Sequence, residues 1–292
     1  MIIFIDLSII YFKRKGIVSF TNKYKTMKIS ELKKDAKMKL SGVFKLAITI
    51  NFIHLLITLV LYSGVSHVEG ILNPIFSLIV SIIEIPLGFG LTACMLKLSR
   101  GEIVGVTDFI SIGFKNFKRA FFLSFAIFFR LIVPIILLVV ASVMPIVINF
   151  AQNIGAEPHP ATNFISLCSL LVAVSSIIYL LYKLLAYTLT TYILVDNNEA
   201  KSKEVIAKSC ELMKGQKTKY IGLILSFFGW LILSGLIGGV VAAFNEFAGN
   251  VIVYALSLLL TPYITFAEIN FYEELSSDSK TVEAQVVDST VE

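Results

Sequence analysis

Charged residues are scarce in this chain. They make up 15% of its 292 residues, whereas hydrophobic residues make up 57%, and the mean hydropathy is +0.84. Soluble domains average about 25% charged and about 45–50% apolar residues. This imbalance excludes a soluble globular enzyme and a disordered chain. Apolar runs of about twenty residues indicate instead that the solvent of this protein is a lipid bilayer.

Cysteine and histidine are scarce as well. The chain has three of each: Cys94, Cys168 and Cys210, and His54, His67 and His159. They are far apart and follow neither the spacing of a disulfide framework nor that of a zinc or other metal site. The sequence therefore predicts no metal and no cofactor.

The familiar motifs of enzymes are missing too. The chain contains no H-E-x-x-H, no G-x-S-x-G and no phosphate-binding loop, and no two membrane carboxylates are spaced to face each other. We therefore expect no catalytic residue and no enzymatic activity. A nucleic-acid partner is excluded because the lysines follow the membrane topology and do not gather on one groove-binding face.

Six apolar segments dominate the rest of the chain. Each holds the roughly 20 residues that a bilayer core requires. They predict an all-α polytopic membrane protein with spans at 43–63, 71–98, 120–148, 165–194, 220–243 and 249–272. An alternative boundary ends the fourth span near Lys183 and leaves 184–195 as an apolar extension.

The basic residues alternate between successive connections. Segments 13–45, 97–119 and 196–219 hold eleven, five and six Lys or Arg, which is 22 of the 25 in the chain. The connections in between hold none: 64–70, 149–164 and 244–248. The positive-inside rule then predicts that both termini of this multi-pass protein are cytoplasmic and that it resides in the cell membrane.

Three of the basic segments also have a helical apolar period: 28–40, 103–119 and 200–214. Apolar faces flanked by lysine suit amphipathic helices at the level of the headgroups, where anionic lipid attracts the lysines. The alternative is that these helices pack on the cytoplasmic ends of the bundle. Both alternatives stay open from the sequence.

Both ends of the chain differ from the membrane domain at 27–275. Residues 1–26 begin with a short apolar run that no basic residue precedes, unlike a secretory signal. We interpret them as a non-native upstream extension, with Met27 as the native start. Residues 276–292 are acidic and lack apolar periodicity, which predicts a disordered tail.

Charged residues inside the spans form the candidate intramembrane polar site: Glu84, Arg130 and Lys183. A buried charge costs about 2.5–3.5 kcal/mol on the insertion scale, so each needs a partner or a route to water. A pair of Glu84 with Arg130 or with Lys183 would mark a substrate or ion path. The alternatives are a structural ion pair, or long basic side chains that reach the inner headgroups.

Small residues are concentrated in the fifth span. Gly235 and Gly239 form a GxxxG pair there. Small residues allow helix backbones to approach closely where no hydrophobic force drives helices together. We expect this pair to pack against another helix of the same chain, such as the sixth span.

Four segments resemble a known family. They are MKISELKKDAKMKLSG at 27–42, LKLSRGE at 96–102, SCELMKGQKTKYIGLILSFFGW at 209–230 and TPYITFAEINFYEEL at 261–275. Together they resemble the bacterial integral membrane family called domain of unknown function 975, typical of Gram-positive firmicutes, over about residues 27–275. The resemblance implies a bacterial plasma membrane. It implies no catalytic residue, because the family has no established activity.

Two functions remain open. The first is a noncatalytic membrane component that binds lipid or a membrane protein partner, with anionic lipid at its cytoplasmic face. The second is a small transporter or permease subunit that uses the three intramembrane charges, which would have to meet in a cavity open to water.

Overall fold

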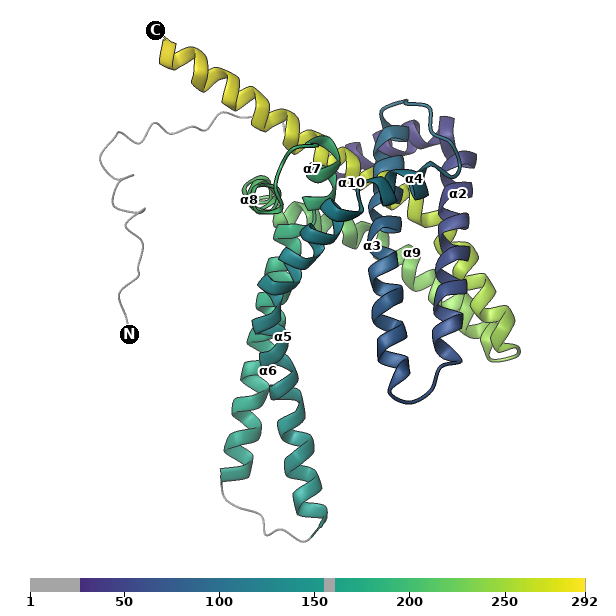
Figure 1. Cartoon of the computed structure of the whole chain (residues 1–292), viewed down its shortest axis with the longest axis vertical. Coiled ribbons are helices and arrows are strands. Elements are labelled where there is room, and N and C mark those ends of the chain that lie inside the picture. Colours follow the sequence, from purple (N-terminus) through teal and green to yellow (C-terminus); the bar gives the residue numbers. More distant parts are fainter. Residues whose placement is uncertain (1–26, 155–160, 292) are drawn as a thin grey trace.

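The computed structural model describes residues 27–154 and 161–291, and all regular structure in these ranges is helical (Figure 1). Its helices are α2 (Ile29–Ser66), α3 (Leu72–Ser99), α4 (Asp108–Lys115), α5 (Phe117–Asn153), α6 (Ala161–Tyr187), α7 (Thr190–Asp196), α8 (Ser202–Leu212), α9 (Lys217–Ala242) and α10 (Glu246–Val291). This confirms the all-α fold. The proposed extension, residues 1–26, lies outside the described residues.

Six helical segments are long and apolar enough to cross a membrane. They are Ile29–Ser66, Leu72–Ser99, Phe117–Phe150, Thr162–Asp196, Lys217–Ala242 and Glu246–Ser277. Each covers one of the six spans that hydropathy predicts, so this is a multi-pass membrane protein.

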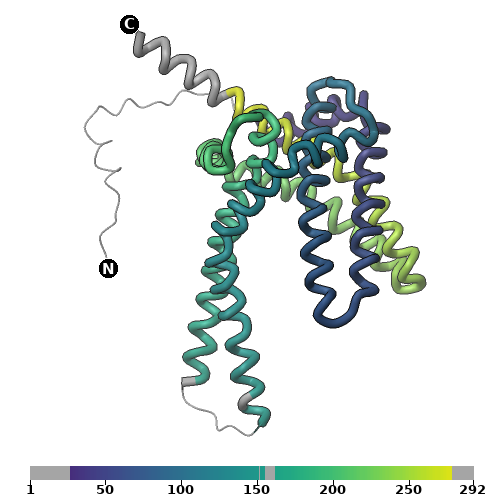
Figure 2. The backbone as a smooth tube through the Cα atoms, in the orientation of Figure 1, coloured from purple at the N-terminus to yellow at the C-terminus, as the bar shows by residue number. Residues whose placement is uncertain are grey.

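The spans form two groups that join at one end of the molecule (Figures 1 and 2). In the first group, α10 packs against α9 and α2, and α2 packs against α3. In the second group, α5 and α6 form a long antiparallel hairpin. The short helices α4, α7 and α8 lie at the joined end, with α4 packed on α3 of the first group. The rest of the hairpin projects away from the first group.

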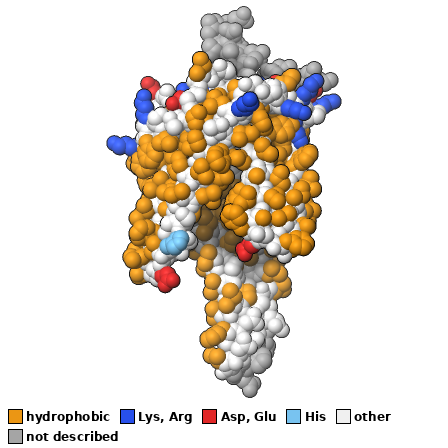
Figure 3. Space-filling view, turned by 90° about the vertical axis from the view of Figure 1, so that its right-hand side faces the viewer, with side chains coloured by type: hydrophobic (Ala, Val, Ile, Leu, Met, Phe, Trp, Pro, Cys, Tyr) orange, Lys and Arg blue, Asp and Glu red, His pale blue; other side chains and the backbone are white. Residues whose placement is uncertain are grey.

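The Lys-rich segments all lie at this joined end, which we call the basic end (residues 28–45, 97–119 and 196–219). Lys and Arg side chains gather there in the space-filling view (Figure 3). Two connections that lack Lys and Arg lie at the opposite end: 67–71 between α2 and α3, and 243–245 between α9 and α10. The alternation in the sequence therefore corresponds to two chemically different ends of one body.

The best-packed core lies near the basic end. The largest fully buried side chains include Phe109, Met213, Phe266 and Phe271. On the hairpin, by contrast, Phe150 is 65% and Leu171 62% exposed, as expected where lipid is the solvent. The protein core therefore fixes the geometry of the basic end most firmly.

All three amphipathic segments bury apolar side chains in the protein core, as the packing alternative expected. Residues 28–40 are the first turns of α2, continuous with the first span, and bury Leu32 and Ala36 in the core. This segment therefore packs on the bundle. The other two segments contain the separate helices α4 and α8, which bury Phe109 and Val205 respectively.

The fourth span is interrupted. Helix α6 ends at Tyr187 and α7 begins at Thr190, whereas the sequence predicted either one helix to 194 or an end near Lys183. The break gives the chain a short independent helix, whose far end carries Asp196.

Helix α10 extends into the C-terminal acidic segment. Disorder was expected from residue 276, but α10 continues through Val291. After Pro262 the helix contains neither proline nor glycine, so no residue interrupts it. Low apolar content alone therefore did not end this helix.

Candidate functional site

Glu84 on α3 lies with α2. Its Oε1 accepts a hydrogen bond of 2.8 Å from the Thr58 hydroxyl, and its Oε2 lies 3.7 Å from His54 Nε2. Both partners belong to the first span. The pairs with Arg130 or Lys183 that the sequence allowed are therefore replaced by a local contact between neighbouring helices.

Within the described residues, Arg130 and Lys183 form no hydrogen bond or ion pair with Glu84. The Arg130 Nη1 donates to the carbonyl of Ala126 at 3.3 Å, so this side chain turns back along α5 toward the basic end. The Lys183 ammonium lies 5.4 Å from the centre of the Tyr179 ring on its own helix. The structure thus does not bring the three predicted site residues together.

The small residues of α9 pack in a register different from the predicted one. An added Cβ at Gly235 or Gly239 would meet nothing within 4 Å. An added Cβ at Gly238, in contrast, would collide with Val253 of α10 and lie 3.1 Å from the Gly249 carbonyl oxygen. The glycine of α9 that contacts the sixth span is therefore Gly238, and not the Gly235–Gly239 pair that the sequence suggested.

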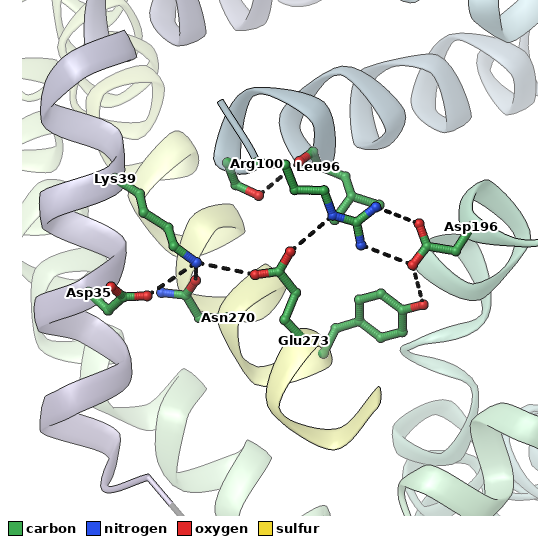
Figure 4. A network of polar contacts seen from close by, with 9 residues as sticks. Asp35, Lys39, Leu96, Arg100, Asp196, Asn270 and Glu273 are labelled. Atoms are coloured by element: carbon green, nitrogen blue, oxygen red, sulfur yellow. Dashed lines mark hydrogen bonds and ion pairs between the residues drawn. The ribbon is translucent and has the colours of Figure 1, made fainter. Parts of the chain in front are cut away.

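A polar network at the basic end holds four helices together (Figure 4). At its centre, the Arg100 guanidinium makes a bidentate contact with Asp196, with Nη1–Oδ1 2.7 Å and Nη2–Oδ2 2.9 Å. Its Nε donates to Glu273 Oε1 at 3.0 Å. Arg100 follows α3, Asp196 ends α7 and Glu273 lies on α10, so one side chain joins three elements.

The electrostatics of Arg100 follow from these contacts. The hydrogen bonds to Asp196 raise the pKa of the guanidinium above its ordinary value, and the hydrogen bond to Glu273 acts in the same direction. Arg100 therefore stays charged throughout the physiological range of pH. Bidentate arginine–carboxylate pairs also fix geometry as well as charge, which suits a joint between helices.

Lys39 extends the same network to α2. Its ammonium contacts Asp35 at 3.2 Å, Glu273 Oε2 at 3.2 Å and the Asn270 side-chain oxygen at 2.7 Å (Figure 4). The Asn270 amide nitrogen donates to the carbonyl of Leu32 at 3.1 Å. Glu273 thus bridges Lys39 and Arg100, and through them α2 and α3.

Two further carboxylates of α10 accept hydrogen bonds from side chains of α9 and α7. Glu274, whose side chain is 7% exposed, accepts two hydrogen bonds of 2.7 and 2.6 Å from the Lys219 ammonium. Glu268 accepts from the Tyr220 hydroxyl at 2.6 Å and from the Tyr192 hydroxyl at 3.3 Å. The last span therefore contacts α2, α7, α9 and the end of α3 through polar side chains.

Reasoning from the sequence missed this network. Arg100 and Asp196 are 96 residues apart and Arg100 and Glu273 are 173 apart, and nothing in the local pattern pairs them. One signal was present. The four segments that carry the family resemblance contain Lys39, Arg100, Lys219 and the Glu273–Glu274 pair. Lys39 and Arg100 contact Glu273, and Lys219 contacts Glu274, so these segments meet in space.

Comparison with known proteins places the chain in a family. A match covers residues 27–279, which is most of the chain. The chain belongs to the family described as protein of unknown function (DUF975). This confirms the resemblance seen in the sequence. No curated protein and no solved structure matches the chain.

Proposed function

We propose that this protein is a noncatalytic component of the bacterial cell membrane that holds anionic lipid at its basic end, with both termini in the cytoplasm. A membrane protein with an acidic surface is the alternative occupant of that end. The observation that carries the proposal is the set of exposed lysines there, which include Lys34, Lys37, Lys45, Lys115, Lys118, Lys201, Lys203 and Lys214.

The position of these lysines favours lipid. They surround the ends of apolar helices, where the headgroups of the cytoplasmic leaflet would lie, and anionic headgroups attract Lys and Arg there. Helix α4 presents Phe114, which is 50% exposed, next to Lys115. An apolar side chain beside an ammonium group is typical of a helix at the membrane interface.

The noncatalytic character is supported by what the carboxylates at this end contact. Glu273 is bonded to Arg100 and Lys39, Asp196 to Arg100, and Glu274 to Lys219. Carboxylates held in ion pairs position helices and are poor general bases. The polar network is best understood as the joint that keeps the lysines of several helices on one surface.

Lipid analysis of the purified full chain tests this proposal. The protein is reconstituted into membranes of equal phosphatidylglycerol and phosphatidylcholine and gently extracted, and the lipid that stays bound is quantified by mass spectrometry. We expect phosphatidylglycerol to be enriched, and the enrichment to fall between about 50 mM and about 500 mM NaCl because salt screens exposed charges. Equal amounts of the two lipids, or enrichment that salt does not change, would contradict it.

One observation favours transport as a second candidate. Glu84 lines a cavity of about 460 Å³ between α3 and α5, together with four hydroxyl side chains: Ser81, Thr92, Ser124 and Thr191. A carboxylate among hydroxyls inside a span is a candidate site for a proton or a cation. This alternative rests on Glu84 alone, since Arg130 and Lys183 lie elsewhere.

Proton flux into proteoliposomes, followed with a trapped pH-sensitive dye, separates the two candidates. Transport predicts a flux that Glu84→Gln abolishes and that Glu69→Gln, at an exposed position near the opposite end, leaves unchanged. If wild-type and empty vesicles acidify at the same rate, proton transport through Glu84 is excluded.

A further inference from the structure

A second cavity lies at the basic end, between α5 and the α7–α8 connection. Its volume is about 710 Å³, and it is lined by α5 residues between Lys118 and Arg130, by Leu194, and by residues 198–203. We call it the basic cup. A volume of this size is in the range of sites that bind small organic ligands.

The charges of the basic cup are almost all of one sign. Five basic side chains line it: Lys118, Arg119, Arg130, Lys201 and Lys203. Glu199 is the one carboxylate among the described residues of the lining. The cup therefore has an excess of positive charge that only an anion could balance.

Arg119 is already engaged in building the wall of the cup. Its Nη2 donates to the carbonyls of Leu194 and Asn197 at 3.0 and 2.5 Å, and its Nη1 donates to the side-chain oxygen of Asn198 at 3.3 Å. Arginine at the end of a helix satisfies the last carbonyls in this way. Arg119 is thus a positioning residue that fixes the end of α7 against α5.

Arg130 is the positively charged side chain of the cup that most needs an anionic partner. It lies about 20 Å along α5 from Phe117, within the apolar span, and its side chain is exposed. Its contact with the Ala126 carbonyl uses one of five N–H donors. No carboxylate in the part of the chain that the structure describes forms an ion pair with Arg130. An exposed guanidinium at that depth is costly unless a lipid phosphate or water reaches it.

The other wall of the cup is apolar. Lys118, Phe122, Ala126 and Arg130 follow one another at intervals of four residues, so they form a single stripe along α5. Phe122 is 60% and Phe125 48% exposed. A ligand in this cup would therefore meet positive charge at both ends of the stripe and aromatic surface between them.

We infer that the basic cup binds one anionic phospholipid, with its phosphate held by Arg130, Lys201 and Lys203. The arginine fork suits phosphate oxygens, and the lysines add charge without demanding a fixed geometry. A zwitterionic lipid presents the same phosphate together with an ammonium group that these lysines repel. This inference rests on the proposed function and assigns it to one site.

Lipid titration of the delipidated full chain in detergent tests the inference. Dioleoylphosphatidylglycerol and dioleoylphosphatidylcholine are added separately, and native mass spectrometry measures the affinity of the first bound lipid. We expect the wild type to bind the phosphatidylglycerol about tenfold more tightly, and Arg130→Gln to remove most of this preference. Lys183→Gln removes a charge from the other hairpin helix and is the matched control, expected to change the affinity less than about twofold.

Further variants keep the test decisive if Arg130→Gln folds poorly. The double variant Lys201→Gln/Lys203→Gln changes exposed side chains only, and we expect it to weaken phosphatidylglycerol binding by about tenfold. Arg130→Lys keeps the charge and should retain most of the binding. Inorganic phosphate distinguishes the two sources of the anion: a lipid site should not be emptied by millimolar phosphate, whereas full competition would show a site for a free anion and overturn the inference.

The outcomes also separate this inference from the proposed function. If the wild type prefers phosphatidylglycerol and both the Arg130→Gln and the double variant keep that preference, anionic lipid binds elsewhere on the basic end, and only the basic cup is wrong. If the wild type binds both lipids equally, the proposed function fails together with the site.

Discussion

Glu84, Arg130 and Lys183, the three charges of the predicted intramembrane site, contact groups close to them rather than one another. Glu84 contacts Thr58 and His54 on the adjacent helix, and Arg130 turns toward the basic end. Both arrangements are what the high cost of an isolated charge in lipid requires. The longest-range polar contacts occur at the basic end, where Arg100 and Lys39 meet Glu273.

Substitution of Arg100 tests this network at the level of one residue. Lysine keeps the charge but cannot reproduce the bidentate contact with Asp196 and the contact with Glu273 at once. We expect Arg100→Lys to lower the free energy of unfolding by about 1–2 kcal/mol, seen as a lower thermal midpoint in detergent.

The matched control for Arg100→Lys is Lys97→Gln, one turn earlier on α3. The Lys97–Glu102 pair is 3.8 Å long and its side chains are 43% and 50% exposed, so its loss should change stability by less than about 0.5 kcal/mol. Equal midpoints for wild type and Arg100→Lys would mean that the network does not stabilise the packing of these helices.

Contacts between helices depend on individual glycines. Helix α4 lies directly on α3, where an added Cβ at Gly90 would overlap the Phe109 carbonyl and one at Gly113 would overlap the Pro86 carbonyl. Backbone atoms on both sides leave no room to adjust. These two glycines, which the GxxxG pattern did not reveal, therefore fix the position of α4.

Gly90→Ala should separate α4 from α3. We expect a loss of about 1–3 kcal/mol from overpacking, although alanine is the better helix former by about 1 kcal/mol. Gly88→Ala on the same helix is the control, because its Cβ would meet nothing within 4 Å. Thermal unfolding in detergent should show a lower midpoint for Gly90→Ala and an unchanged midpoint for Gly88→Ala. If both variants unfold at the wild-type temperature, the close contact is absent.

The register of α9 against α10 gives a second test between neighbouring glycines. Gly238→Ala brings a methyl group against Val253 and the Gly249 carbonyl, whereas Gly239→Ala points into open space. We expect the first to destabilise the protein and the second to leave it unchanged or stabilise it slightly. The reverse order would restore the Gly235–Gly239 pair as the packing face.

The whole molecule combines a firmly packed basic end with an apolar hairpin that projects from it. The polar network joins α2, α3, α7 and α10 at that end, and Lys219 ties in α9. Near the opposite end α5 and α6 expose residues such as Val140 and Leu171. A binding site with a defined geometry is therefore expected at the basic end, where packing fixes the side-chain positions.

The sequence was sufficient for the fold and insufficient for the site. Bilayer thickness sets the length of a span, so hydropathy alone identified all six. The rotation of each helix about its axis is not encoded in hydropathy: one residue, or about 100°, separates Gly238 from Gly239 and decides which packs. Contacts such as Arg100–Asp196 depend on several such rotations at once, so they emerged only from the structure.

The orientation of the basic end is the claim on which both proposals depend. Green fluorescent protein and alkaline phosphatase, fused in parallel after Glu292, report it directly, because the first fluoresces only inside the cell and the second is active only outside. We predict fluorescence and no phosphatase activity, since the positive-inside rule places the basic end in the cytoplasm. Active phosphatase without fluorescence would put the lysines outside the cell and contradict the account.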